Sequence, residues 1–434
     1  MSDAGPVSTS DTTTAGRSLI HHPDFRRLWT GDALGQLGAQ LTVLALPIFA
    51  VQQLAATEWE MGVLTAAEFA AFLLIGLPAG AWVDRMRKRR VLIVADLVRA
   101  AVLATVVVTA ATGHASIPLL VVAALVISAA TVFFDVSHQS YIPGLVGLDH
   151  LVEGNSKLQA TASVAQVAAP ALGGLLLRVI AAPALIAVTV VTYLVSAFAV
   201  SRIRQVETPP HRDTRRPLRV EIAEGLRFVV HEPYLRRIVA CTSLGNFAGA
   251  ISGAVLVIYV LRTLDLDTAA YGAILSASAV GGLLGAVVAG RLAQRIGEGR
   301  VIPLSALVMA PAAALTPLAS LSDLPAPAVL IVGGAAFGFA VIVYNVAQVS
   351  FRQRVCPPPL LGRMNASVRF IVWGSMPIGG LLGGWLGTHL GVLPTLWVSV
   401  GVMALAAVPV VVSPLLRMRD LPGAPVAEEP APAA

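Results

Sequence analysis

The sequence predicts an all-α integral membrane protein with twelve transmembrane helices in two six-helix, pseudo-symmetric bundles. Apolar residues come in blocks of about 20, the length of helix that spans about 30 Å of hydrocarbon. Basic residues gather in alternate connections between the blocks, and the second half of the chain repeats the first. Of the 434 residues, 56% are hydrophobic and only 12% are charged. Soluble proteins carry about 25% charged residues, so the composition excludes an ordinary soluble protein.

Each apolar block is predicted to be a helix, because a strand in lipid would leave backbone groups unpaired. The first six spans are expected near residues 33 to 54, 61 to 83, 91 to 112, 117 to 138, 158 to 180 and 184 to 201. The other six are expected near residues 238 to 261, 269 to 291, 301 to 321, 327 to 350, 364 to 388 and 392 to 415.

The basic residues predict the orientation of the chain. The connections on the side of both termini hold 26 of the 30 Lys and Arg residues, whereas the other side holds Arg178 and Arg262. By the positive-inside rule, both termini should face the cytoplasm, with the protein in the plasma membrane. This bias explains the net charge of +6 without a nucleic-acid partner.

Composition also divides the chain into segments. We expect a disordered tail at 1–20, a six-helix bundle at 21–202, a cytoplasmic linker at 203–236, a second bundle at 237–416 and a disordered tail at 417–434. The linker should contain an amphipathic helix near 219–230. Cys241 and Cys356 have no metal-type spacing and are interpreted as packing residues.

An internal repeat supports the two halves. An offset of 210 residues aligns HHPDFRRL, which starts at His21, with HEPYLRRI, which starts at His231. The same offset pairs Gly62 with Gly272, and the glycines at 173 and 174 with those at 383 and 384. Two parallel six-helix repeats are typical of transporters whose site lies at the midplane between the halves.

Three segments carry a resemblance to a known family. They are Gly80–Arg90 (GAWVDRMRKRR), Phe134–Gln139 (FDVSHQ) with the following Tyr141, Ile142, Pro143 and Asn155, and Ala169–Gly174 (APALGG). Over roughly residues 20 to 415, the chain resembles the major facilitator superfamily, and within it the branch of macrolide and enterobactin exporters. The resemblance implies that the first segment is a cytoplasmic gate, formed by Gly80, Asp84, Arg85, Lys88 and Arg89.

The resemblance also implies roles for single residues. Asp84 would cap the eleventh span near residues 362 to 365, and Asp135 would pair with Lys88 or Arg89, or else carry protons. Pro170, Gly173 and Gly174 resemble the antiporter motif of drug exporters. Simple helix packing remains the alternative for these three, since proline bends a helix and glycines allow close approach.

Ionisable groups inside a span need a partner or a task, because the bilayer makes an isolated charge costly. Glu68 is the first candidate for proton coupling, with hydrogen bonding to a neighbouring helix as the alternative. Asp96 and Arg99 are expected to neutralise each other. Arg369 is expected either to meet an anionic group of the substrate or to pair with a carboxylate.

Uncharged polar residues on the first and seventh spans are candidates for the substrate cavity. Gln36, Gln40 and Asn246 could line it, or could form interhelical hydrogen bonds instead.

No motif for enzyme chemistry is present: there is no phosphate-binding loop, no metal-type His and Cys set, and no nucleophile with its base. We therefore expect no enzymatic activity and no cofactor. The predicted function is secondary active export of an amphipathic drug-like or natural-product molecule by alternating access, as a proton antiporter. The expected partners are the substrate, protons and the lipid bilayer, with the chain as a monomer. A uniporter or importer, and a membrane sensor or assembly subunit that does not transport, are the alternatives.

Overall fold

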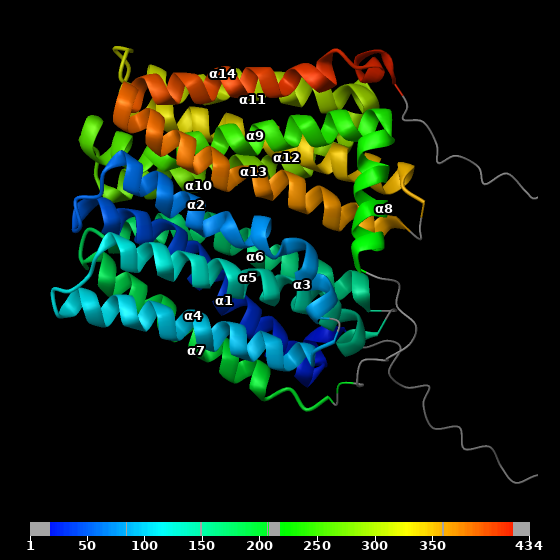
Figure 1. Ribbon diagram of the computed structural model, residues 1–434, viewed down its shortest axis with the longest axis horizontal. Coiled ribbons are helices and arrows are strands. Elements are labelled where there is room, and N and C mark those ends of the chain that lie inside the picture. The colour runs from blue at the N-terminus through cyan, green and yellow to red at the C-terminus, as the bar shows by residue number, and fades with distance from the viewer. Residues whose placement is uncertain are drawn as a thin grey trace, which may run out of the picture.

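The computed structural model describes residues 18–83, 85–147, 150–205, 207, 218–357 and 360–419. Within these ranges the chain forms helices and no strand. We call α1 to α7 the first half and α9 to α14 the second half. In Figure 1 the helices of the first half lie in the lower part of the molecule, and those of the second half lie above them.

The helices follow the predicted spans closely. The first half contains α1 (Pro23–Gln52), α2 (Glu58–Leu74), α3 (Gly76–Val83), α4 (Lys88–Ala111), α5 (Ile117–Val146), α6 (Leu151–Leu176) and α7 (Ala182–Ser201). The second half contains α9 (Pro233–Ile258), α10 (Thr268–Ile296), α11 (Glu298–Leu318), α12 (Ala326–Val355), α13 (Leu361–Leu390) and α14 (Val392–Val411). A π-helical turn, Tyr259–Thr263, extends α9, and short 3-10 turns lie at Leu19–His21 and Pro414–Arg417.

Ten helices in the described part of the chain are long and apolar enough to cross a membrane. Two predicted spans are not among them. The span at 61–83 is divided at Ile75 into α2 and α3, each shorter than a crossing helix. The span at 158–180 falls in α6, where polar residues such as Gln159, Ser163 and Gln166 lower the mean hydropathy. Polar residues in α6 are consistent with a wall that faces water rather than lipid.

The repeated HHP and HEP segments begin equivalent helices. His22 caps α1 by accepting a hydrogen bond at Nδ1 from the Phe25 amide at 3.1 Å. At the equivalent place the Glu232 carboxylate accepts from the Leu235 amide and caps α9. Proline at the first helical position follows in both cases, where its missing N–H is not needed. The repeat in the sequence therefore encodes the same helix start twice.

The N-terminal end of α1 and the C-terminal end of α14 lie at the right of Figure 1. We call this the basic end, because Arg87 and Arg90 lie at the start of α4 and Arg202 lies at the end of α7. Helix α8 (Leu218–His231) runs across this end and packs on α13 through Gly225 and a 2.5 Å ion pair between Glu224 and Arg363. The predicted amphipathic helix near 219–230 corresponds to α8.

The apolar core is continuous at the opposite end and divided at the basic end. The largest cluster joins both halves and includes Val51 and Leu64 with Val255, Tyr259 and Leu396. Towards the basic end, one cluster lies within the first half, around Phe25 and Phe134, and a separate one lies within the second half, around Tyr344 and Phe351. The halves are thus packed together at one end and independently packed at the other.

Candidate functional site

A cavity of about 800 Å³ lies along the first half, between α1, α5 and α6. Its wall reaches the basic end, since it includes Ile142 from the last turn and a half of α5 and Asn155 from the first turns of α6. The remaining lining residues are largely polar: Asp32, Gln36, Asp135, His138, Gln139, Ser156, Gln159 and Ser163, with Leu158, Ala160 and Ala162. A volume of this size accommodates a drug-sized molecule.

An acid and a histidine lie side by side in this wall. Asp32 of α1 is 3% exposed, and its Oδ1 lies 3.4 Å from Nε2 of His138 on α5. Gln36, one turn further along α1, interacts with the same carboxylate. Sequence reasoning missed Asp32 because it lies one residue before the predicted span at 33–54. Its i, i+4 spacing from Gln36 was the signal that could have found it.

A second charged pair lies behind this wall, inside the first half. Arg99 donates to Asp96 at 3.1 Å, and both side chains are buried. The Ser196 hydroxyl of α7 donates to the other Asp96 oxygen at 2.7 Å, while the Arg99 guanidinium lies 4.6 Å from the centre of the Phe134 ring. The expected neutralisation of Asp96 by Arg99 is what the structure shows, and it ties α4 to α5 and α7.

Asp135 lies against the second half. Its Oδ2 is 3.7 Å from a guanidinium nitrogen of Arg369 on α13, and both side chains are more than a third exposed. The prediction that Asp135 pairs with Lys88 or Arg89 is therefore wrong, and the alternative of a carboxylate partner for Arg369 is the one found. The Arg369 guanidinium also lies 5.8 Å from the Phe72 ring centre.

Lys88 and Arg89 have other partners. Their backbone amides donate to the Glu207 carboxylate, at 2.7 and 3.3 Å, and so cap the start of α4. The Arg89 guanidinium donates to the carbonyls of Val200 and Ser201. These contacts fix the gate segment to the end of α7. Of the other gate residues, Gly80 has open space where a Cβ would lie, and Arg85 is exposed. Asp84 lies outside the described residues, so its expected cap on the eleventh span stays a prediction.

Glu68 lies on α2 and is partly buried. No described residue forms a hydrogen bond or ion pair with its carboxylate, and its electrostatic neighbour is Tyr271 of α10, in the second half. The alternative interpretation of Glu68, a hydrogen bond to a neighbouring helix, is therefore not found among the described residues. A carboxylate without a partner inside a span is a candidate functional group, so proton coupling by Glu68 stays a prediction.

The other predicted cavity residues divide between two places. Gln40 lies one turn beyond Gln36 on the same side of α1, but it is not among the described residues that line the cavity. Asn246 lines a separate cavity of about 160 Å³ inside the second half, where its amide donates to the Val372 carbonyl at 3.2 Å. The structure does not bring Asn246 to the cavity that Gln36 lines.

Two glycine contacts close the opposite end between the halves. A Cβ on Gly62 of α2 would lie 2.6 Å from the Gly384 Cα and 2.7 Å from the Gly380 carbonyl oxygen of α13. A Cβ on Gly272 of α10 would lie 3.0 Å from the Gly174 Cα and 2.3 Å from the Pro170 carbonyl oxygen of α6. These two sets are equivalent under the 210-residue offset. We call them the α2–α13 seam and the α6–α10 seam.

Gly173 has a different neighbour. A Cβ there would lie 2.5 Å from Leu44 of α1, so Gly173 packs within the first half while Gly174 packs across to the second. The motif at 170–174 therefore supplies close packing on two faces of α6.

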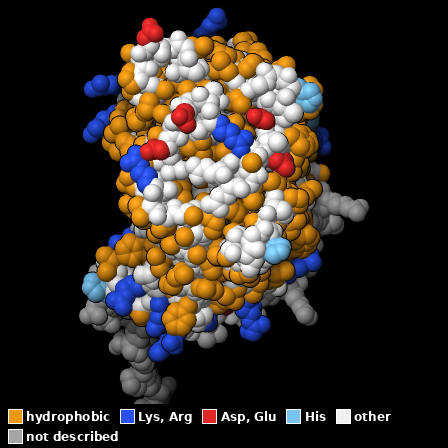
Figure 2. Space-filling model, turned by 90° about the vertical axis from the view of Figure 1, so that its left-hand side faces the viewer, with side chains coloured by type: hydrophobic (Ala, Val, Ile, Leu, Met, Phe, Trp, Pro, Cys, Tyr) orange, Lys and Arg blue, Asp and Glu red, His pale blue; other side chains and the backbone are white. Residues whose placement is uncertain are grey.

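Two arginines reinforce the closed end. Arg262, beyond α9, donates to the carbonyls of Val51 and Ala56 at 2.7 and 2.8 Å. Arg178 pairs with Asp267, which caps α10. The Ala270 amide and Arg178 together hold the pKa of Asp267 below its ordinary value. Figure 2 views this end, where acidic side chains gather around a basic one and no hollow passes between the halves.

The match to a known family decides what this arrangement is. Residues 14–433 match the family of transmembrane secretion effectors within the major facilitator superfamily. The chain belongs to this family. It is a multi-pass membrane transporter and not an enzyme, as the resemblance in the sequence predicted.

Relatives and solved structures agree with this membership. The chain is 28% identical to the multidrug efflux pump Tap of Mycolicibacterium fortuitum, over 89% of this chain and 95% of that protein. It is 22% identical to the macrolide efflux protein A of Streptococcus pyogenes, over 85% and 90%. The nucleoside transporter NupG shares the fold, with a TM-score of 0.74 at 13% identity over 89% of this chain and 99% of that one.

Proposed function

We propose that this transporter exports an amphipathic drug-like or natural-product molecule by alternating access, in exchange for protons. The observation that carries the proposal is the polar cavity of about 800 Å³ that reaches the basic end, while two repeat-equivalent glycine seams close the other end. The similarity to proteins named as multidrug and macrolide efflux pumps supports export and this substrate class.

In this proposal the membrane contains twelve spans in two pseudo-symmetric six-helix bundles, at 21–202 and 237–416. The α2–α3 pair and α6 supply the two spans beyond the ten apolar helices. The linker at 203–236 and both termini lie in the cytoplasm, so the cavity as described is open inward. The excess of Lys and Arg at the basic end supports this orientation.

Alternation follows from the repeat. Because the seams are equivalent, a rocking motion that parts Gly62 from Gly384 also parts Gly272 from Gly174 and opens the cavity outward. Closing the basic end would then bring α5 and α6 towards the second half. Arg262 and Arg178 must release their partners in the first and second halves during this step.

Proton exchange has three candidate groups. Glu68 lacks a hydrogen-bond partner among the described residues, Asp32 faces His138 in the cavity wall, and Asp135 faces Arg369. Protonation of Asp135 would remove its attraction to Arg369 and weaken a contact between the halves. Proton binding at Asp135 would thus shift the balance between the conformations of the two halves, which links protonation to alternating access.

Efflux from pump-deficient cells tests the proposal. We expect the wild type to lower accumulation of a fluorescent cationic dye or a macrolide, an uncoupler to abolish this, and Glu68→Gln to fail at normal membrane abundance. Asp323→Asn is the matched control, since Asp323 is an exposed acid in the connection before α12. It should behave as wild type.

Other outcomes favour the rivals. Transport that persists in Glu68→Gln and ignores an imposed pH gradient would support a uniporter or importer. Absence of transport of every substrate by the reconstituted protein would support the sensor or assembly subunit.

A further inference from the structure

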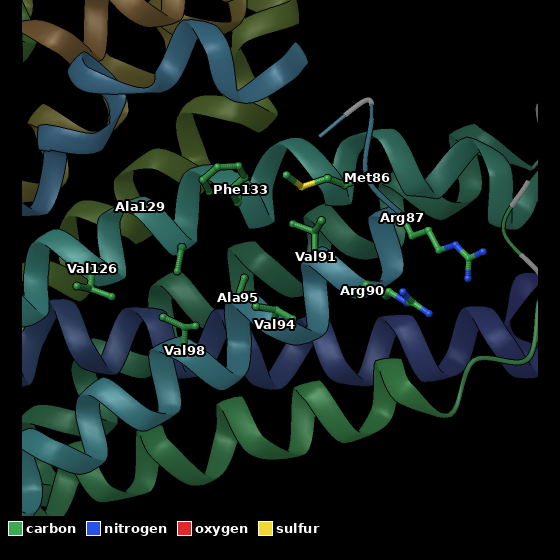
Figure 3. A pocket seen from close by; sticks show the side chains of 11 residues that line it. Met86, Arg87, Arg90, Val91, Val94, Ala95, Val98, Val126, Ala129 and Phe133 are labelled. Carbon is green, nitrogen blue, oxygen red and sulfur yellow. The ribbon is translucent and has the colours of Figure 1, made fainter. Parts of the chain in front are cut away.

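A second hollow lies between α4 and α5, on the surface of the first half. It has a volume of about 650 Å³ and shares no lining residue with the polar cavity. We call it the α4–α5 groove. Its walls are apolar and include Val94, Val98, Val126 and Phe133, and Val94 is 57% exposed. Figure 3 shows Arg87 and Arg90 together at one end of the groove, with their guanidinium groups directed away from the apolar walls.

The dimensions of the groove match one leaflet of a bilayer. Along α4, Arg87 and Val98 are eleven residues apart, which is about 16 Å at 1.5 Å per residue. The hydrocarbon of a bilayer is about 30 Å thick, so the groove covers about half of it. In a chain that crosses the membrane, exposed valines at this depth face acyl chains rather than water.

The two arginines at the mouth are free to bind an anion. Both side chains are exposed, and neither guanidinium group forms an ion pair or hydrogen bond with a described residue. The neighbouring acid Glu207 is already engaged by the amides of Lys88 and Arg89, and the Arg89 side chain is held by α7 carbonyls. Guanidinium groups bind phosphate oxygens in a bidentate manner, which makes a phosphate the fitting partner.

We propose that the α4–α5 groove is a binding site for one anionic phospholipid of the leaflet at the basic end. An acyl chain lies along Val94 and Val98, and the headgroup phosphate lies on Arg87 and Arg90. The site is separate from the cavity and does not depend on the direction or coupling of transport. It adjoins the connection between α3 and α4, so the lipid contacts the gate segment.

The second half provides an internal comparison. Under the 210-residue offset, Arg87 corresponds to Gly297 and Arg90 to Arg300. The hollow that Gly297 lines, of about 400 Å³, lies mainly between α10 and α12 rather than between α11 and α12, and Glu298 in its wall pairs with Arg354 at 2.6 Å. The second half thus has glycine in place of one of the two arginines and an ion pair beside it, so one anionic lipid site is expected rather than two.

Native mass spectrometry of the full-length protein tests the site. The protein in mild detergent is mixed with equal amounts of phosphatidylglycerol and phosphatidylcholine with matched acyl chains. We expect about a tenfold preference for phosphatidylglycerol, because two surface cations act on one anionic headgroup. Arg87→Gln with Arg90→Gln should reduce the preference below about twofold. Val94→Trp should lower retention of the lipid while leaving the charges in place.

The control is Arg295→Gln with Arg300→Gln, which removes two exposed arginines at the same end of the second half. It should keep the wild-type preference. All variants are first compared by size-exclusion profile and melting temperature. Lipid binding is interpreted only for variants that match the folded wild type in both. The proposal is overturned if the Arg87 and Arg90 variant retains the same preference as the control, or if Val94→Trp binds as much phosphatidylglycerol as wild type.

Discussion

Single residues in the membrane interior differ in how far their partners could be predicted. Asp96 and Arg99 are three residues apart on one helix, so local geometry fixed their pairing. Asp135 and Arg369 lie in different halves, and only the packing of α5 beside α13 brings them together. Local spacing cannot reveal such a partner, and the family resemblance had implied Lys88 or Arg89 as the partner of Asp135 instead.

The Asp135–Arg369 contact predicts a measurable coupling. Asp135→Asn and Arg369→Gln should each lower the melting temperature in detergent. The double variant should lose less free energy of unfolding than the sum of the two single losses. Since both side chains are more than a third exposed, the coupling free energy should be about 1 kcal/mol or less. Asp135→Asn with Arg417→Gln, which do not pair, is the additive control. Strict additivity in both cycles would mean that the ion pair contributes nothing.

The same variants separate two roles of Asp135. If Asp135 serves as a partner of Arg369, the reversed pair Asp135→Arg with Arg369→Asp should restore part of the efflux that either single change removes. If it carries protons, the reversed pair stays inactive and Asp135→Asn alone removes the sensitivity of efflux to an uncoupler.

At the scale of helices, the two seams depend on glycine because helix backbones meet there. The α6–α10 seam places the Gly272 Cα beside the Pro170 carbonyl, where any side chain collides with backbone atoms. Gly253 of α9 is also helical, but a Cβ there meets nothing within 4 Å. The two glycines look alike in the sequence and differ only in their neighbours.

We therefore predict opposite effects of alanine at these two positions. Gly272→Ala should destabilise the described state by about 1 to 3 kcal/mol through overpacking. Gly253→Ala should be neutral or stabilising by about 0.5 to 1 kcal/mol, because alanine favours helix. Melting temperature measures stability. Spin labels at Val179 and Leu324, both exposed beyond the seams, measure the distance across the closed end, which should lengthen only in Gly272→Ala.

For the Gly272 prediction, an unchanged label distance together with a lowered melting temperature would indicate general destabilisation without opening of the seam. A wild-type melting temperature in Gly272→Ala would show that α6 and α10 can move apart without loss of free energy of unfolding.

At the scale of the whole molecule, the division of the core decides which end is open. One apolar cluster joins the halves at the opposite end, whereas the clusters at the basic end stay within each half. The second half must move relative to the first for the cavity to change sides. Helix α8 crosses the basic end and is attached to α13 by the Glu224–Arg363 pair, so it should move with the second half.

The proposed orientation can be measured by cysteine labelling of intact cells. In a background with Cys241→Ala and Cys356→Ala, a membrane-impermeant maleimide should label Leu324→Cys directly. It should label Met86→Cys only after permeabilisation. Both residues are exposed, at 66% and 45%, so exposure does not bias the comparison. The reverse pattern would place the basic end outside and would contradict both the orientation and the inward-open state.

The sequence by itself determined the helical segments, the internal repeat and the family. Each depends on information that is local or periodic: a block of apolar residues, a cap such as His22 before proline, or a motif at a constant offset. Glu68 stood out for the same reason, as an isolated charge within an apolar run.

Only the tertiary structure decided the contacts between distant helices. It divided the span at 61–83 into α2 and α3. It placed Asp32 beside His138 and Asp135 beside Arg369. It also placed Asn246 in a separate cavity of the second half. It also showed that Gly62 contacts Gly384, the repeat of Gly174, and that Gly174 contacts Gly272, the repeat of Gly62. The physical reason is that side-chain partners across helices depend on the rotation and offset of each helix, which apolar periodicity in a membrane leaves undetermined.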